Sequence, residues 1–383
     1  MIDGPQLRRL LFRLIEIDSV NPSLVAGARG EAEIAEFLSG WLRAQGIACK
    51  LQEAAPGRPN VTARIGGSGD TGRDALLIVA HLDTVGAGDM PQPFVPREEN
   101  GRLYGRGALD IKSGVAAMCA AAAAVVRGRN PLSRAFRIAA VADEECHSLG
   151  TQSLCQKYSA EAAVVLEPTD LRLCIAHKGY AWLEVITRGR AAHGSLPAVG
   201  RDAIRHMGRV LGALEALERK LASLAPHPLL GNASLHASLI SGGHEVSSYA
   251  AECRLEYERR TLPGESDAQV EAEIRELLRS LERRDPEISA TARLISSRPA
   301  YEIPRHAPIA LAAADAIRDV TGSVEHCGMG FWTDTALLGA AGIPGVVFGP
   351  RGEGLHGAAE YVEIESVTAC AEVMCRVILS TCG

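Results

Sequence analysis

Two adjacent carboxylates, Glu144 and Glu145, come just after an apolar run, Phe136–Ala142. The run has the length and composition of a buried strand, so the pair lies at the carboxyl end of a strand. A second apolar run, Ala75–Ala80, leads directly into His81-Leu82-Asp83. Metal hydrolases need such a pair, because one carboxylate holds a cation while its neighbour takes a proton from water.

Three more side chains of ligand type lie in Gly-rich segments or directly after an apolar run. Asp110 lies in a Gly-rich turn, residues 105–114, that enters an Ala-rich helix. Glu167 directly follows another apolar run, and His356 lies in a Gly-rich loop after the run Gly345–Phe348. Because sites in α/β proteins collect beyond the carboxyl ends of the strands, we expect these side chains to share one cleft.

The set as a whole predicts two hard-to-borderline cations that share one carboxylate. The predicted ligands are His81, Asp110, Glu145, Glu167 and His356. Asp110 on its tight turn is the best candidate for the bridge, and Asp83 is placed to accept the second ring N–H of His81. Taken singly, each feature has a simpler explanation, such as a structural histidine, a phosphate-binding glycine turn or a solvated acidic pair. The combination favours the metal site, and the turn lacks the spacing of the known phosphate loops.

The elements that must position these residues alternate between helices and short apolar strands, which predicts an α/β fold. The expected helices are 31–45, 114–127, 308–320 and one from residue 366 onward; the expected strands are 75–80, 136–142, 162–166 and 345–348.

The pattern changes after Lys178-Gly179. Half-exposed strands at 180–187 and 252–258 and helices at 202–221 and 267–282 suit a small α+β sandwich. The α/β pattern then returns, so the second domain is inserted into the first. We expect residues 1–178 and 293–383 to form the metal-binding domain and residues 179–292 to form the insertion.

Composition excludes several classes of protein. The chain has 383 residues, 47% of them apolar, and a net charge of −6 without a basic stripe, so we expect two domains and no nucleic-acid partner. The longest apolar run, Val115–Val126, is too short to cross a bilayer, and we expect no membrane association. The N-terminus lacks the features of a signal peptide, and the ten cysteines contain no C-x-x-C. Reduced thiols in a cytoplasmic protein are therefore expected.

The motifs, in order, resemble those of the acetylornithine deacetylase / succinyl-diaminopimelate desuccinylase / aminoacylase metallopeptidases. They are His81-Leu-Asp-Thr-Val, Gly105-Arg-Gly-Ala-Leu-Asp-Ile-Lys-Ser-Gly, Asp143-Glu-Glu, Leu166-Glu-Pro and the late His356. The resemblance implies a zinc-peptidase α/β domain with an inserted lid that dimerises. It implies one metal on His81, Asp110 and Glu167, a second on Asp110, Glu145 and His356, Glu144 as the general base, and a cis peptide after Asp110.

The same resemblance extends to the insertion. His193, in Gly189-Arg-Ala-Ala-His193-Gly, matches a histidine that reaches into the partner subunit's site as an oxyanion donor. Arg260 matches an arginine that binds the substrate carboxylate. Ser247 stands where many members have a substrate-binding asparagine, which puts that contact in doubt. The remaining histidines, such as His147, His177, His206 and His326, are interpreted as structural.

The leading interpretation is a dinuclear zinc amidohydrolase that removes an N-acyl group from an amino acid, as in the acetylornithine deacetylase branch. The segment Gly330-Phe-Trp-Thr-Asp334 and the loop at Phe348-Gly-Pro resemble that branch. A dipeptidase or carboxypeptidase with the same site is the first alternative, with a short peptide as substrate, and a catalytically silent binding protein is the second. Co²⁺ or Mn²⁺ could replace Zn²⁺, and a homodimer through the lid is expected.

Overall fold

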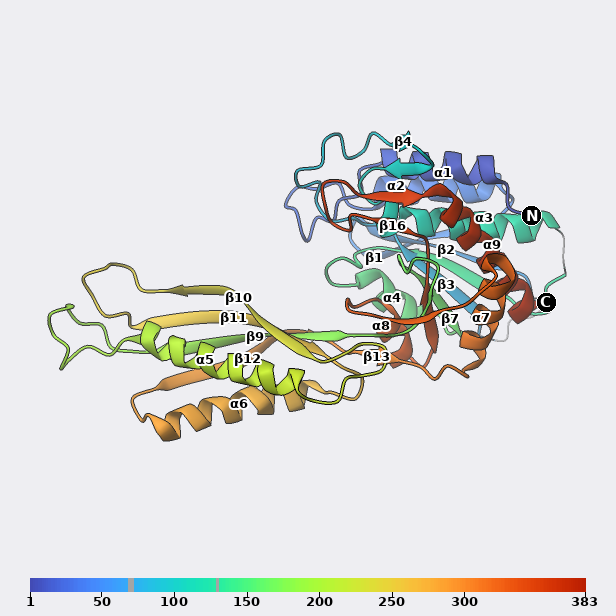
Figure 1. Ribbon diagram of the computed structural model, residues 1–383. Coiled ribbons are helices and arrows are strands. Elements are labelled where there is room, and N and C mark those ends of the chain that lie inside the picture. The colour runs from blue at the N-terminus through green and yellow to red at the C-terminus, as the bar shows by residue number, and fades with distance from the viewer. Residues whose placement is uncertain (68–71, 129–130) are drawn as a thin grey trace. The chain divides into compact units, whose positions relative to one another are not determined.

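The computed structural model describes residues 1–67, 72–128 and 131–383, which form two compact units. The outer unit comprises Met1–Ile175, Ile303–Cys327 and Thr333–Gly383, and the inserted unit comprises Ala176–Glu302 and Gly328–Trp332. The outer unit is α/β and the inserted unit is α+β (Figure 1), so the predicted fold class is confirmed.

The large sheet has the strand order β1-β2-β6-β3-β7-β15-β8-β13, with β14 also paired to β8. Its strands are β1 (Lys50–Ala55), β2 (Arg58–Ile65), β3 (Leu76–His81), β6 (Phe136–Val141), β7 (Ala163–Leu166), β8 (Leu173–His177), β13 (Tyr301–Glu302), β14 (His326–Met329) and β15 (Gly345–Phe348). Four neighbouring strands, β6, β3, β7 and β15, run parallel, so their carboxyl ends meet at one edge. This edge is where the predicted ligands begin.

The outer unit's helices pack on this sheet. They are α1 (Gly4–Glu16), α2 (Ala32–Ala44), α3 (Ser113–Gly128), α4 (Leu149–Lys157), α7 (Pro308–Thr321), α8 (Thr335–Ala340) and α9 (Ile364–Cys382). Helices α3 and α9 pack against each other and on β3, while α4 and α8 form a second pair over β1 and β7. β3 is buried along its whole length, as expected for a strand covered on both faces.

Helix α3 is the core helix of the outer unit. Its alanine-rich sequence lets neighbouring helices approach closely, and nearly every side chain is buried. By length and composition the helical stretch Ala108–Gly128 could cross a membrane, but 89% of its apolar window is buried inside the protein. A core helix passes the same test, and the packing of α3 against α1 and α9 identifies it as one.

The inserted unit is an antiparallel sheet, in the order β10-β11-β9-β12, with two helices on one face. The strands are β9 (Gly179–Arg188), β10 (Ser234–Gly242), β11 (Glu252–Thr261) and β12 (Ser289–Arg298), and the helices are α5 (Ala203–Ala222) and α6 (Asp267–Arg284). Leu183, Met207, Leu255 and Ile274 pack together in its core. β12 runs through residues 292/293, where the sequence pattern placed the end of the insertion.

A third, small sheet lies beside the Gly-rich turn. Its order is β16-β17-β5-β4, with β4 (Arg97–Glu99), β5 (Arg102–Tyr104), β16 (Gly352–Glu353) and β17 (Tyr361–Glu363). β5 ends just before the turn at residues 105–114, and His356 lies between β16 and β17. Antiparallel pairing of β5 with β17 therefore brings the segments that carry Asp110 and His356 together.

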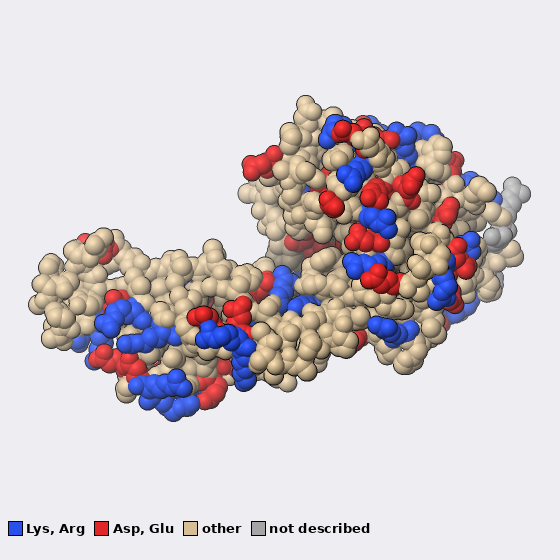
Figure 2. Space-filling model, in the orientation of Figure 1, with Lys and Arg blue, Asp and Glu red and all other residues tan. Residues whose placement is uncertain are grey.

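The predicted helices and strands occur within three residues of their expected positions. On the face drawn in Figure 2, cationic and anionic side chains are interspersed over both units.

Candidate metal centre

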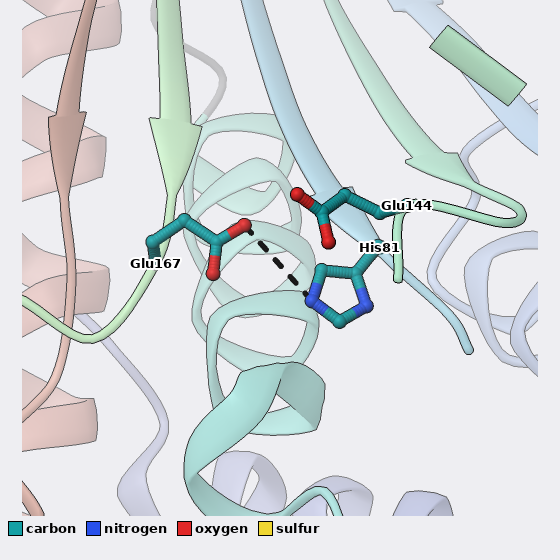
Figure 3. Close-up of side chains that lie close together, drawn as sticks. All are labelled: His81, Glu144 and Glu167. Atoms are coloured by element: carbon teal, nitrogen blue, oxygen red, sulfur yellow. Dashed lines mark ion pairs between the residues drawn. The ribbon is translucent and has the colours of Figure 1, made fainter. Parts of the chain in front are cut away.

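The outer unit brings all five predicted ligands and Glu144 together at the carboxyl edge of the parallel strands. His81 ends β3, Glu167 directly follows β7, and Glu144 and Glu145 follow β6. In Figure 3 the carboxylates of Glu144 and Glu167 both point toward the imidazole of His81. The side chains come from separate strands, and the parallel register places them side by side.

Asp110 lies between the two imidazoles. Its Oδ1 is 3.1 Å from Nε2 of His81, and its Oδ2 is 3.2 Å from Nε2 of His356. Glu167 Oε1 approaches the first imidazole at 3.9 Å, and Glu145 Oε2 approaches the second at 3.4 Å. The contacts therefore fall into two groups that share Asp110, which is the arrangement of a bridging carboxylate.

Distance alone does not separate the proton acceptor from the ligands. Ligand atoms of His81, Asp110 and Glu145 lie within 4.8 Å of one another, and so do those of His81, Glu144 and Glu167. Glu144 is thus as close to His81 as a ligand would be. The expectation that Glu144 is the proton acceptor rests on its place in the motif.

The donor set fits divalent cations. It consists of carboxylate oxygens and imidazole nitrogens, which are ligands of Zn²⁺ and of other divalent first-row transition metals. Glu145 Oε1 is buried and has no hydrogen-bond partner among the described residues. Burial raises the pKa values of Glu144 and Glu167 well above their ordinary range, and neighbouring carboxylates add to the shift. A cluster of acids that resists ionisation is a site where positive charge stabilises the ionised form.

Carboxylates beside the imidazoles favour the protonated form of the rings. Hydrogen bonds to Asp110 and Glu145 raise the pKa of His356 to about 10. Burial by itself would raise the pKa of Asp110, but the bonds from His356 and His81 hold it below its ordinary value. A metal ion must displace these protons, since only neutral imidazole is a ligand.

Asp83 orients three residues of the site. Nδ1 of His81 faces the backbone carbonyl of Asp83 at 2.9 Å and its carboxylate at 3.6 Å, so the carbonyl rather than the predicted carboxylate is the nearer acceptor. The carboxylate of Asp83 instead accepts the backbone amides of Glu144 and Glu145, each at 3.1 Å. Nε2 of His81 thereby faces Asp110 and Glu167.

A buried polar network supports the acidic pair from behind. Arg58 donates to Asp143 Oδ1 at 3.0 Å and also pairs with Glu31, which accepts the backbone amide of Asp143 at 3.1 Å. Asn21 donates to Asp83 at 2.7 Å and to Asp143 at 3.0 Å. Asp143 has φ +66°, a conformation that non-glycine residues rarely adopt. The network holds this turn and so aims Glu144 and Glu145; the sequence analysis did not identify it.

Glu360 holds the turn that carries Asp110. Its buried carboxylate pairs with Arg106 at 2.7 Å and accepts the backbone amides of Gly107, Leu109 and Asp110 at 3.1, 2.9 and 3.1 Å. The peptide between Asp110 and Ile111 is cis, as the resemblance implied. No sequence motif pointed to Glu360.

Asp334 is a further buried acid near the site. It accepts a hydrogen bond from Thr151, and burial raises its pKa to about 6. Its charge in turn raises the pKa of Glu144. The segment containing Asp334 stood out in the sequence only through its resemblance to one branch of the family.

The other three predicted residues, His193, Ser247 and Arg260, lie in the inserted unit. The segments of His193 and Ser247 are adjacent, because the amide of Gly194 donates to the carbonyl of Ser247 at 2.7 Å. His193 is exposed, and its Nδ1 is 2.8 Å from Ser195 Oγ. Arg260 pairs with Glu258 at 2.7 Å, and its guanidinium lies 5.5 Å from the ring centre of Tyr180.

Arg260 and His193 lie at opposite ends of the inserted sheet. β11 pairs with β9 without a register shift, from Arg260 opposite Tyr180 to Glu252 opposite Arg188. Eight residues of β-strand span about 27 Å, and His193 comes after the far end of β9. One small ligand cannot contact both side chains of the same inserted unit.

The histidines interpreted as structural lie in varied surroundings. His177 is fully buried, its Nδ1 lies 3.0 Å from the carbonyl of Lys178, and burial lowers its pKa to about 4. Nδ1 of His206 lies 3.0 Å from the carbonyl of Arg188. His147 lies beside the network, with Nδ1 3.6 Å from Asp143.

The chain is similar to known proteins over almost its whole length. The sequence profile of Peptidase family M20/M25/M40 matches residues 77–380. An acetylornithine deacetylase of Myxococcus xanthus is 29% identical over 393 residues, covering 99% of this chain and 98% of that protein.

Two solved structures share the fold. A tripeptidase from Staphylococcus aureus has a TM-score of 0.81 at 20% identity, covering 100% of this chain and 99% of that one. Bacillus subtilis YXEP protein, described as a dinuclear metal-binding peptidase, has a TM-score of 0.76 at 16% identity, covering 99% of both chains.

Proposed function

Because the chain belongs to Peptidase family M20/M25/M40, we propose that it is a two-metal hydrolase that removes an N-acyl group from an amino acid. Membership confirms the family resemblance and makes the chain a hydrolase of amide bonds. The observation that carries the finer proposal is the position of Asp110 between His81 and His356, with Glu144 alongside. The full-length likeness to an acetylornithine deacetylase supports an N-acyl amino acid as substrate.

We assign one cation to His81, Asp110 and Glu167, and the other to Asp110, Glu145 and His356. Zinc is the proposed metal, with cobalt or manganese as substitutes that the same donors accept. Two bound divalent cations would supply the Lewis acidity that brings a water proton within reach of a carboxylate base near neutral pH.

Glu144 is the proposed base. It takes the proton of the attacking water and then gives it to the leaving nitrogen, which needs a carboxyl group whose pKa lies nearer neutrality than usual. Burial and the neighbouring Glu167 push its pKa in that direction. Asp83 keeps the backbone of Glu144 in place through the bond to its amide.

The residues of the inserted unit bind and polarise the substrate in this proposal. Arg260 binds its carboxylate, His193 donates to the oxyanion, and Ser247, which has a shorter reach than the asparagine of many family members, is the third proposed contact. Because His193 and Arg260 of one chain are too far apart for one small ligand, we propose that they serve a shared site from two chains. A homodimer through the inserted unit follows from this proposal. A cytoplasmic location is proposed separately, from the ten cysteines without a C-x-x-C motif.

The test is hydrolysis after metal removal and readdition of zinc, cobalt or manganese to separate samples. The panel contains N-acetylornithine, other N-acetyl amino acids, N-succinyl-diaminopimelate and several dipeptides, with the Glu144→Ala variant as the matched control. Zinc-dependent release of acetate by the wild-type protein alone is the expected result. Turnover of dipeptides alone would replace the deacylase by a peptidase, and a protein that binds no metal would overturn the proposal.

A further inference from the structure

Two cysteines lie side by side at the edge of the outer unit. Cys174 is in β8 and Cys327 is in β14, and these strands are paired. Backbone bonds from Leu173 to Glu325 (2.9 Å) and from Lys178 to Met329 (3.0 Å) advance in the same direction, so the strands run parallel. The bond from Leu173 sets this residue opposite His326 and therefore places Cys174 beside Cys327.

The spacing of paired strands suits a disulfide. Neighbouring strands are about 4.8 Å apart, and the Cα atoms of disulfide-bonded cysteines lie about 4.4–6.8 Å apart. A hydrogen bond between their side chains brings the thiols of Cys174 and Cys327 into contact. Neither cysteine is in a disulfide bond.

The two thiols differ in access and charge. Cys174 is fully buried, while 7% of Cys327 is exposed. The bond from Cys174 lowers the pKa of Cys327, and the nearby guanidinium of Arg172 lowers it further, against the effect of burial. Thiolate is the reactive form of cysteine, so Cys327 is the thiol that reacts first with an outside reagent.

We propose that Cys174 and Cys327 are a dithiol site that small-molecule disulfides oxidise reversibly to an internal disulfide. The Cys327 thiolate attacks one sulfur of the small disulfide, forming a mixed disulfide and releasing one small thiol. Cys174 then loses its proton and attacks the sulfur of Cys327, forming the internal bond and releasing the second small thiol. Two electrons pass from the protein thiols to the small disulfide, and a dithiol reductant reverses both steps.

The position of the pair gives the oxidation a structural consequence. The chain passes from the outer to the inserted unit at residues 175/176 and again at 327/328. A bond between Cys174 and Cys327 would join β8 and β14 at these points. Cys174 lies one residue before the last outer-unit residue, Ile175, and Cys327 is itself the last outer-unit residue before the second passage. It would also close a loop that contains most of the inserted unit, and closing a long loop stabilises the folded state.

The test uses the full-length, metal-loaded protein and oxidised glutathione. After oxidation, denaturation and alkylation, intact mass should show eight alkylated thiols in place of the ten of the reduced protein. Peptide mapping should identify Cys174 joined to Cys327, and dithiothreitol should restore all ten thiols. The oxidised protein should have the higher melting temperature.

Single variants separate the two roles. Cys174→Ala should accumulate one glutathione adduct on Cys327, because the thiol that resolves it is absent. Cys327→Ala should gain neither adduct nor disulfide. Cys375→Ala, which changes a half-buried cysteine of α9, is the matched control and should still lose two thiols. Equal thiol loss in the double variant Cys174→Ala/Cys327→Ala, a disulfide mapped to other cysteines, or ten thiols retained by the wild type would each overturn the proposal.

Discussion

Glu360 accepts a hydrogen bond from the backbone amide of Asp110 at 3.1 Å, although the two residues are 250 positions apart in the chain. The same carboxylate binds two further amides of the turn and the guanidinium of Arg106. Asp110, the proposed bridging carboxylate, is therefore held from behind by a second buried carboxylate. Residues that orient metal ligands contribute to metal affinity without touching the metal.

Glu360→Gln should weaken zinc binding by about 10- to 100-fold. The amide keeps the shape of the side chain, but its NH₂ group faces backbone N–H donors and Arg106. Titration against a competing chelator measures the affinity, and urea unfolding checks that the variant is folded. Glu363→Gln, three residues on in β17 and half-buried, is the control. Equal affinities in the wild type and Glu360→Gln would contradict the positioning role.

Glu144→Gln and Glu145→Gln should fail in different ways, although both side chains lie within ligand distance of the centre. Glu144→Gln should keep two metal ions per chain and lose on the order of 10²-fold or more in kcat, because the proton acceptor is gone. Glu145→Gln should bind less metal than the wild type, because it changes a proposed ligand. Metal content by atomic emission, measured beside kcat, separates the two. Near-wild-type turnover of Glu144→Gln would refute its assignment as the base.

Mixed dimers test the shared site. His193→Ala and Glu144→Ala should each be nearly inactive alone. After co-expression, half of the dimers are hybrids with one complete site of two, so about one quarter of wild-type activity should return. A mixture of Glu144→Ala with Asp110→Ala offers no complete site and should stay inactive. No regained activity in the first mixture would show that His193 does not act across subunits.

His177 should make the inserted unit sensitive to acid. Burial lowers its pKa from 6.5 to about 4 in the folded protein, so the unfolded state binds more protons between these values. Folding stability should therefore be unaffected by this group above pH 6.5 and fall as the pH drops toward 4, by up to about 3 kcal/mol. Charging the ring would place a cation between Tyr301 and Trp332 in a buried site.

Urea unfolding followed by tryptophan fluorescence measures this effect, since two of the three tryptophans, Trp182 and Trp332, are in the inserted unit. His177→Gln should show a shallower loss of stability between pH 6.5 and 4 than the wild type. His236→Gln changes a side chain that is 63% exposed and should match the wild type. Identical slopes in all three proteins would exclude His177 as the titrating group.

The sequence by itself determined the elements whose signal is local. Apolar runs such as Phe136–Ala142 and Gly345–Phe348 are strands because a buried strand needs only a few consecutive apolar residues. His81, Glu145 and Glu167 lie at or just beyond the ends of such runs. They meet at one edge of the sheet because parallel strands end together. The family motifs added the roles of these residues, which local pattern does not contain.

Only the tertiary structure decided which distant residues hold the site in place. Asn21, Glu31, Arg58 and Glu360 bond to the turns of the candidate centre across 62 to 254 residues, and a pairing over that separation leaves no periodic signal in the sequence. It also decided that His193 and Arg260 lie at opposite ends of one sheet, since this follows from the register of β9 with β11. Register depends on the simultaneous packing of many side chains, so no single segment of the chain specifies it.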